Sequence, residues 1–125
     1  MKDHRFAKGR LKSFIYAARG MYKLATTEHS IMLQLVIALL VTAAGFYFNI
    51  SATEWMVQTM AIGLVLSVEG INTAIEKTTD FIHPDFNKKI GFIKDISAGA
   101  VFFAAISAFV TGLIIYYPKF SAIFT

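Results

Sequence analysis

Three long apolar runs constrain the fold of this chain more than any other feature of its sequence. They cover residues 31–50, 55–68 and 96–117, and none of them contains Lys, Arg, Asp or Glu. About 20 helical residues cross the roughly 30 Å hydrocarbon core of a bilayer. The first and third runs are therefore long enough to span a membrane. The second is long enough only if it continues through Glu69 and Asn72 to residue 76.

The composition agrees with a location in lipid. Hydrophobic residues make up 56% of the 125 residues and charged residues 16%, whereas soluble domains carry about 25% charged residues. Cysteine is absent, which excludes disulfides and thiolate chemistry. We therefore predict a single all-α integral membrane domain of residues 1–125, with transmembrane helices at 31–50, 55–76 and 96–117.

The basic residues predict the orientation of the chain. Most of the Lys and Arg residues precede residue 24 or lie between residues 77 and 95, and the connection of residues 49–54 has none. Because loops rich in Lys and Arg stay in the cytoplasm, we expect the N-terminus and the connection 77–95 to be cytoplasmic. The net charge of +4 and the placement of the basic residues thus favour binding to an anionic membrane surface or to phosphate ligands. No nucleic-acid partner is expected.

The first 29 residues predict an amphipathic helix that lies on the membrane surface. Apolar residues recur at steps of three and four, and basic residues fall on the other side. Such a helix rests in the headgroup plane with its apolar face down. The apolar positions are Leu11, Phe14, Ile15, Ala18, Met21, Tyr22 and Ala25, and the basic ones are Lys8, Lys12, Arg19 and Lys23.

Four oxygen-bearing side chains form a stripe on the second predicted span. Glu69, Asn72, Glu76 and Asp80 fall within an arc of about 80° on a helix. An intramembrane carboxylate costs about 3 kcal/mol on insertion scales, so packing alone gives no reason to keep these residues. Carboxylates and an amide, without His or Cys, suit a hard cation such as Mg²⁺.

Further charged residues are expected at the cytoplasmic end of this stripe. Glu28 closes the surface helix, and Lys94 and Asp95 open the third span. Carboxylates for Mg²⁺ beside a lysine for phosphates are typical of a nucleotide site. The sequence contains neither a GxxxxGK[ST] nor a GxGxxG motif, so a P-loop or protein-kinase phosphate loop is excluded. A simple ion pair of Glu76 or Asp80 with Lys94 is the structural alternative.

Two sequence motifs resemble those of a known family. Residues 69–80 read EGINTAIEKTTD and residues 94–101 read KDISAGAV, in a chain with three apolar spans and a Glu at the end of a basic helix. This combination resembles the prokaryotic diacylglycerol kinase family, which includes the undecaprenol kinases, over nearly the whole chain. The resemblance implies a small lipid kinase of the bacterial cytoplasmic membrane, assembled as a homotrimer with active sites shared between protomers.

The resemblance also implies roles for individual residues. Glu69 matches the general base that accepts the proton of the lipid hydroxyl, and Glu28 and Glu76 match the carboxylates that hold Mg²⁺ on ATP. Asn72 and Asp80 are supporting residues, and Ala98 lies with Glu69 at the lipid substrate. The implied contacts of ATP are Arg10, Tyr16, Glu28, Glu76, Asp85, Phe86, Asn87, Lys94 and Asp95.

The sequence departs from other family members at three positions. Ser30 stands where many members have Asn, Gln34 where some have a carboxylate, and Ala98 where some have Ser. These differences spare the base and metal positions but leave the acceptor open between diacylglycerol and undecaprenol. The NTAIE segment, Glu54–Trp55 and Pro118–Lys119 look like members from Gram-positive bacteria and Bacteroidetes, some of which act on undecaprenol.

Two other functions are compatible with a charged stripe in a membrane helix. An oligomeric protein could conduct protons or cations through Glu69 and Asn72, although the second span offers only Gln58, Thr59 and Ser67 toward the outer face. A non-catalytic membrane subunit would leave the stripe without a purpose. The leading prediction is therefore ATP-dependent phosphorylation of a membrane lipid alcohol.

Overall fold

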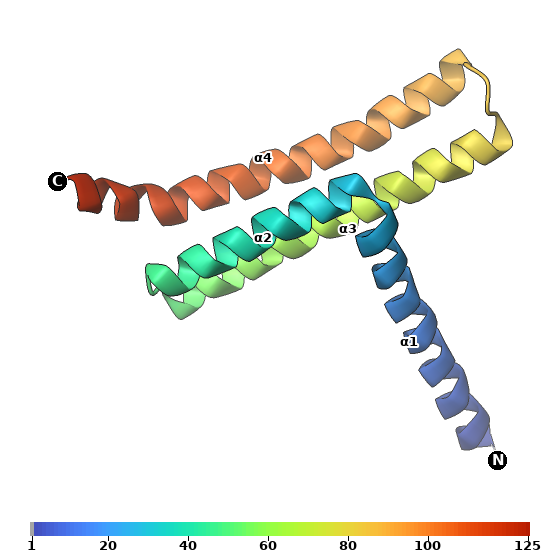
Figure 1. Ribbon diagram of the computed structural model, residues 1–125. Coiled ribbons are helices and arrows are strands. Elements are labelled where there is room, and N and C mark those ends of the chain that lie inside the picture. The colour runs from blue at the N-terminus through green and yellow to red at the C-terminus, as the bar shows by residue number, and fades with distance from the viewer. Residues whose placement is uncertain (1) are drawn as a thin grey trace.

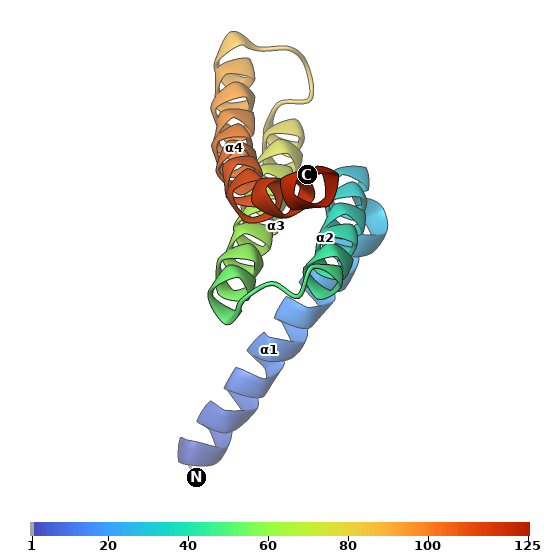
Figure 2. The same cartoon turned by 90° about the vertical axis from the view of Figure 1, so that its left-hand side faces the viewer.

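The computed structural model describes residues 2–125, with side chains from Asp3 onward. Four helices account for most of them: α1 (Lys2–Thr27), α2 (His29–Tyr47), α3 (Ala52–Ile82) and α4 (Lys88–Phe124). No strand occurs within residues 2–125, so the predicted all-α class is confirmed. Helix α3 lies alongside both α2 and α4, and α1 leaves this bundle at a steep angle (Figures 1 and 2).

Local sequence signals set the ends of α3 and α4. Ser51 caps α3, since its hydroxyl accepts a hydrogen bond from the Glu54 amide while the Glu54 carboxylate accepts one from the Ser51 amide. Helix α3 ends at Ile82, because the residue before Pro84 disfavours helical geometry. The Asn87 side chain then caps α4. The predicted connection of residues 77–95 is therefore mainly helical, with a short loop at residues 83–87.

Two of the four helices are long and apolar enough to cross a membrane. These are α2 and α4. Helix α3 is longer than α2, but Gln58, Glu69 and Asn72 lower the hydropathy of its apolar stretch, and it does not qualify by composition. The middle transmembrane helix of residues 55–76 remains a prediction.

The distribution of polar side chains in the bundle is inverted relative to a soluble protein. Large apolar side chains cover the outside of all four helices, and the buried hydrophobic residues are Ile31, Ile50, Ala104 and Ile115. An exposed apolar surface of this extent marks contact with lipid or with other proteins. The buried polar residues are Gln58, Glu69, Asn72, Thr73, Thr79 and Ser97.

A close contact joins α2 to α3 at their connecting turn. A Cβ atom added at Gly45 would lie 2.6 Å from Cη2 of Trp55 and 3.1 Å from Cδ1 of Ile50. Only glycine therefore lets the indole ring pack against the backbone of α2. The ring of Phe46 covers the same indole, with 4.8 Å between the ring centroids. This packing holds the two helices together at the turn.

Helix α1 touches the bundle only near its C-terminal end. Its apolar residues Leu11, Phe14 and Met21 are exposed, as expected of a face that rests on a membrane. Leu24 is partly buried, and its Cδ1 lies 3.2 Å from the position of a Cβ at Gly70 of α3. Glycine at position 70 thus permits the close approach that brings the end of α1 beside the second half of α3.

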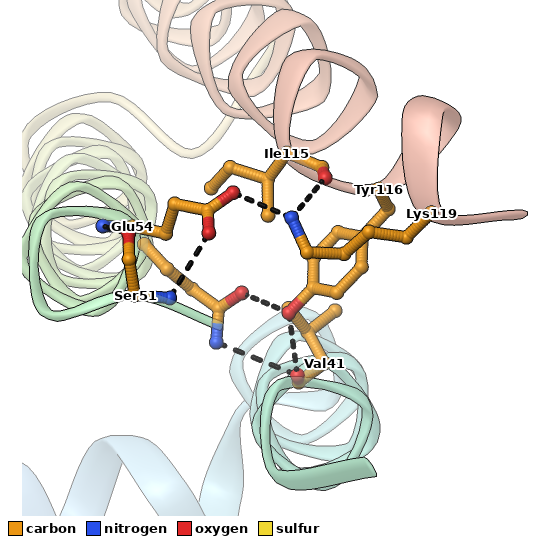
Figure 3. Close-up of polar contacts among 7 residues, drawn as sticks. Val41, Ser51, Glu54, Ile115, Tyr116 and Lys119 are labelled. Carbon is orange, nitrogen blue, oxygen red and sulfur yellow. Dashed lines mark hydrogen bonds and ion pairs between the residues drawn. The ribbon is translucent and has the colours of Figure 1, made fainter. Parts of the chain in front are cut away.

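A polar cluster ties α4 to α2 and α3 at the end where α2 and α3 connect (Figure 3). The Lys119 ammonium donates to the Glu54 carboxylate over 2.6 Å and to the carbonyl oxygen of Ile115 over 3.0 Å. Next to this pair, the Tyr116 hydroxyl donates to Oε1 of Gln58 over 2.5 Å. The Gln58 amide donates in turn to the carbonyl oxygen of Val41 on α2.

Pro118 lies inside α4 beside this cluster, where the helix bends (Figures 1 and 2). Proline lacks an amide hydrogen and crowds the preceding turn, so it bends a helix. The bend brings Phe120 over Phe48, with 5.0 Å between the ring centroids. The Lys119 contacts hold the bent segment against the start of α3.

The Glu54–Lys119 ion pair predicts a stability difference that depends on pH. The Lys119 hydrogen bond, followed by the Ser51 backbone hydrogen bond, lowers the pKa of Glu54 below its ordinary value of 4.5. A carboxyl whose pKa is lower in the folded state stabilises the fold above the unfolded-state pKa and loses that contribution as pH falls through the folded-state pKa. Glu54→Gln should therefore melt at a lower temperature than the natural chain at pH 7, and this difference should shrink below about pH 4.5.

Melting of both proteins in detergent between pH 3 and pH 8 checks this prediction. Comparing the two chains cancels the titration of every other carboxyl. A difference in melting temperature that stays constant across this range would contradict the role of the ion pair.

Candidate active site

The predicted stripe on α3 runs from the interior of the bundle to its surface. Helix α3 is continuous from Ala52 to Ile82, so Glu69, Asn72, Glu76 and Asp80 keep the spacing of one helical face. The Glu69 and Asn72 side chains are buried, with exposed fractions of 7% and 6%, whereas Glu76 and Asp80 are exposed. A carboxylate in the interior thus lies two turns from one that solvent and ligands can reach.

A chain of hydrogen bonds crosses from α4 to this stripe. The Ser97 hydroxyl donates to Oδ1 of Asn72 over 2.7 Å, and Nδ2 of Asn72 donates to Oε1 of Glu76 over 3.3 Å. Thr73 donates its hydroxyl to the backbone carbonyl of Glu69. No hydrogen bond to the Glu69 carboxylate occurs among the described residues.

The last residue of the stripe, Asp80, forms an ion pair with Lys94, which is one of the two ion pairs expected as the structural alternative to a nucleotide site. Lys94 Nζ lies 2.5 Å from Oδ1 of Asp80, and both side chains are well exposed. Lys94 and Asp95 belong to the second turn of α4, close to the loop of residues 83–87. The structure therefore places the predicted nucleotide-contacting lysine at the open end of the stripe.

Glu28 occupies a break between two helices. It is the single extended residue between α1 and α2, with φ −107° and ψ 114°. It occupies the N-cap position of α2, but its side chain makes no capping hydrogen bond. Its carboxylate forms an ion pair with Lys77 of α3 over 3.1 Å. Because Lys77 follows Glu76 directly, the ion pair brings Glu28 to the part of α3 that carries Glu76.

Other predicted site residues lie apart from the stripe in the single chain. Arg10 and Tyr16 are exposed on α1. The Arg10 guanidinium lies over the ring of Phe6, and the Arg19 guanidinium lies over the ring of Tyr16, both on the same helix. Asp85 and Phe86 lie in the loop that follows α3, and Asn87 caps α4. Within residues 3–125, no three acidic or histidine side chains are close enough to hold a metal ion between them.

Two positions where the sequence departs from other family members differ in their surroundings. Ala98 is exposed on α4. Gln34 lines an apolar cavity of about 580 Å³ between α2, α3 and α4, and its Oε1 atom is buried without a hydrogen-bond partner among the described residues.

Sequence patterns did not single out Ser97 and Lys77, although both contact the predicted site. Ser97 lies within the KDISAGAV motif, which is the sequence signal that could have drawn attention to it. Lys77 follows Glu76, but its contact with Glu28 depends on where α1 crosses α3.

Comparisons with known proteins identify the family. Residues 15–116 match the family model for prokaryotic diacylglycerol kinase. The chain is 39% identical over 119 residues to the undecaprenol kinase of Bacillus subtilis (strain 168), covering 94% of this chain and 97% of that protein. It is 26% identical over 110 residues to the diacylglycerol kinase of Escherichia coli (strain K12), covering 88% of this chain and 90% of that protein.

The family match includes α2, α3, the second half of α1 and most of α4, so it contains all the predicted catalytic and metal-binding residues. It agrees with the resemblance carried by the two motifs of α3 and α4. The chain therefore belongs to the prokaryotic diacylglycerol kinase family and is a lipid kinase.

Proposed function

We propose that this protein transfers the γ-phosphate of ATP to the hydroxyl of a lipid alcohol at the cytoplasmic surface of the membrane. In the proposed reaction, Glu69 accepts the proton of the lipid hydroxyl. The hydroxyl oxygen bonds to the γ-phosphorus of ATP, and ADP leaves. The observation that carries this proposal is the buried Glu69 carboxylate, which accepts no hydrogen bond from the described residues and lies two turns from the exposed Glu76. A general base of this kind contributes about 10²–10⁴-fold to a rate.

Glu28 and Glu76 fit the ligand preference of Mg²⁺. This ion usually binds to one or two carboxylates and completes its shell with phosphate oxygens and water. Glu76 is exposed, and Glu28 is partly so, with 22% of its side chain accessible. When bound, Mg²⁺ would neutralise charge on the phosphates of ATP. The ion pair of Glu28 with the Lys77 ammonium supports a role of this carboxylate in holding a cation.

Lys94 is suited to contact the phosphates even though it is paired with Asp80. Exposed ion pairs are worth about 0–1 kcal/mol, so exchange of Asp80 for a phosphate oxygen costs little. Asp95 and the loop of residues 85–87 lie near the same end of the bundle. In this arrangement Asp80 holds Lys94 near the stripe until ATP arrives.

We further propose that a homotrimer completes the site. A single chain leaves Arg10 and Tyr16 on an exposed helix, and its described side chains do not group three possible metal ligands. Small exposed residues of α4, among them Ala98 and Ala100, permit close approach of a neighbouring helix. The apolar surface of the bundle is available for the same contact.

We propose undecaprenol rather than diacylglycerol as the preferred acceptor. The support is the higher identity to the undecaprenol kinase of Bacillus subtilis, 39%, than to the diacylglycerol kinase of Escherichia coli, 26%. The Glu54–Lys119 ion pair joins two of the sequence features shared with members from Gram-positive bacteria.

The first prediction separates the roles of two glutamates on α3. Glu69→Gln should lower kcat by at least about a hundredfold, because the amide cannot accept the proton, while the affinity for Mg²⁺ and ATP changes little. Glu76→Gln should mainly weaken the affinity for the metal and the nucleotide. Steady-state kinetics at varied Mg²⁺ and ATP concentrations measure both effects.

Glu54→Gln, at the other end of α3, is the matched control and should keep its turnover. Near-normal turnover of Glu69→Gln would show that Glu69 is not the base. Full phosphotransfer in the presence of excess chelator would contradict the metal role of Glu28 and Glu76.

The second prediction concerns the shared site. Glu28 lies between α1 and α2, whereas Glu69 lies on α3, so different protomers can supply them. Mixed oligomers of the inactive variants Glu28→Gln and Glu69→Gln should recover part of the activity, because some sites contain neither substitution. Oligomers that contain both chains and remain inactive would place the site within one chain.

The third prediction tests the acceptor. Purified protein in mixed micelles, supplied with ATP labelled at the γ-phosphate, should phosphorylate undecaprenol with a higher kcat/KM than diacylglycerol. Both lipids are presented at the same mole fraction, so that surface dilution affects them equally. A higher kcat/KM for diacylglycerol would overturn the acceptor proposal and leave the lipid kinase assignment intact.

A further inference from the structure

Ser97 is a buried serine of α4 that the proposed reaction does not use. Its exposed fraction is 8%, and its hydroxyl crosses to α3 to donate to Oδ1 of Asn72 over 2.7 Å. Asn72 is itself 6% exposed. The contact therefore lies in the interior of the bundle, where water does not compete for either group.

This use of a serine hydroxyl differs from the usual one in this chain. Most other serine and threonine hydroxyls in its helices donate to a backbone carbonyl of their own helix, usually four residues earlier. The residues that donate to the carbonyl four positions earlier include Ser13, Thr42, Thr73, Thr78 and Ser107. Ser97 instead donates a hydrogen bond to a side chain of the neighbouring helix.

The partners of Asn72 require this direction of donation. An ionised carboxylate can only accept hydrogen bonds, so the Glu76 carboxylate must face the amide nitrogen of Asn72, as it does over 3.3 Å. The amide oxygen then points the other way and needs a donor. The Ser97 hydroxyl is that donor, and a buried amide oxygen without one would lose the free energy of a hydrogen bond.

We propose that Ser97 is a positioning residue that holds the Asn72 amide in the orientation that donates to Glu76. It thereby sets the direction of the carboxylate that binds the metal. This inference rests on the metal role proposed for Glu76. Loss of a group that orients a metal ligand typically weakens metal affinity or activity by about 10–100-fold.

The experiment measures metal binding directly. Mn²⁺ replaces Mg²⁺, a non-hydrolysable ATP analogue is present, and the loss of the free-ion electron paramagnetic resonance signal reports the affinity. Ser97→Ala should bind Mn²⁺ about tenfold more weakly than the natural chain. Ser97→Thr, which keeps the hydroxyl, should bind it nearly as well as the natural chain.

Ser107→Ala is the matched control, because Ser107 is an α4 serine whose hydroxyl bonds to the Phe103 carbonyl of its own helix. It should leave Mn²⁺ affinity unchanged. In a Glu76→Gln background, Ser97→Ala should cause little further loss, since an amide at position 76 accepts either orientation of Asn72.

Three outcomes decide the matter. If Ser97→Ala lowers the melting temperature but leaves Mn²⁺ affinity unchanged, the serine has a packing role and the inference is wrong. An equal loss in the natural and Glu76→Gln backgrounds would also overturn it. If Glu76→Gln alone leaves Mn²⁺ affinity unchanged, the metal role of Glu76 fails, whatever Ser97→Ala does.

Discussion

The structure depends on the pairing of polar side chains inside a bundle whose surface is apolar. In apolar surroundings an unpaired polar group is costly, so the polar residues face one another between the helices. The buried polar residues include the candidate base Glu69 and, near it, Asn72 and Ser97. Interhelical contacts between α3 and α4 occur along much of their length, in the pairs Glu54–Lys119, Gln58–Tyr116, Asn72–Ser97 and Asp80–Lys94.

These contacts fix how α4 lies along α3. Sliding one helix past the other would break several hydrogen bonds at once and leave buried groups unpaired. The small residue Ala104 lets the two helices approach closely between the polar contacts. A rigid pair of helices is useful to a kinase, because phosphoryl transfer depends mainly on the positions of charged groups.

The site is assembled without a phosphate-binding loop. Its charged groups come from the second half of α3, from the second turn of α4 and from Glu28, which lies between α1 and α2. In the proposed reaction the buried Glu69 meets the lipid hydroxyl, and the exposed Glu76 meets the nucleotide. Along the stripe, the side chains go from buried at Glu69 and Asn72 to exposed at Glu76 and Asp80, in the direction from lipid to water that the proposed reaction requires.

Several features of this protein follow from its sequence alone. The apolar runs require helices in lipid, because only a helix satisfies all of its backbone hydrogen bonds there without neighbours. The spacing of these four residues on a helix also places them on one face, because helical periodicity depends only on local geometry. They are Glu69, Asn72, Glu76 and Asp80. Pro84 and the cap at Asn87 likewise mark where one helix ends and the next begins.

Other features were decided only by the tertiary structure. The sequence left three partners open for Lys94, which were a phosphate, Glu76 and Asp80. The structure pairs Lys94 with Asp80. The contacts of Ser97 and Lys77 depend on which faces of α4 and α1 meet α3, and they join residues far apart in the chain. Helical periodicity determines the face on which a residue lies, but only packing between helices determines what that face meets.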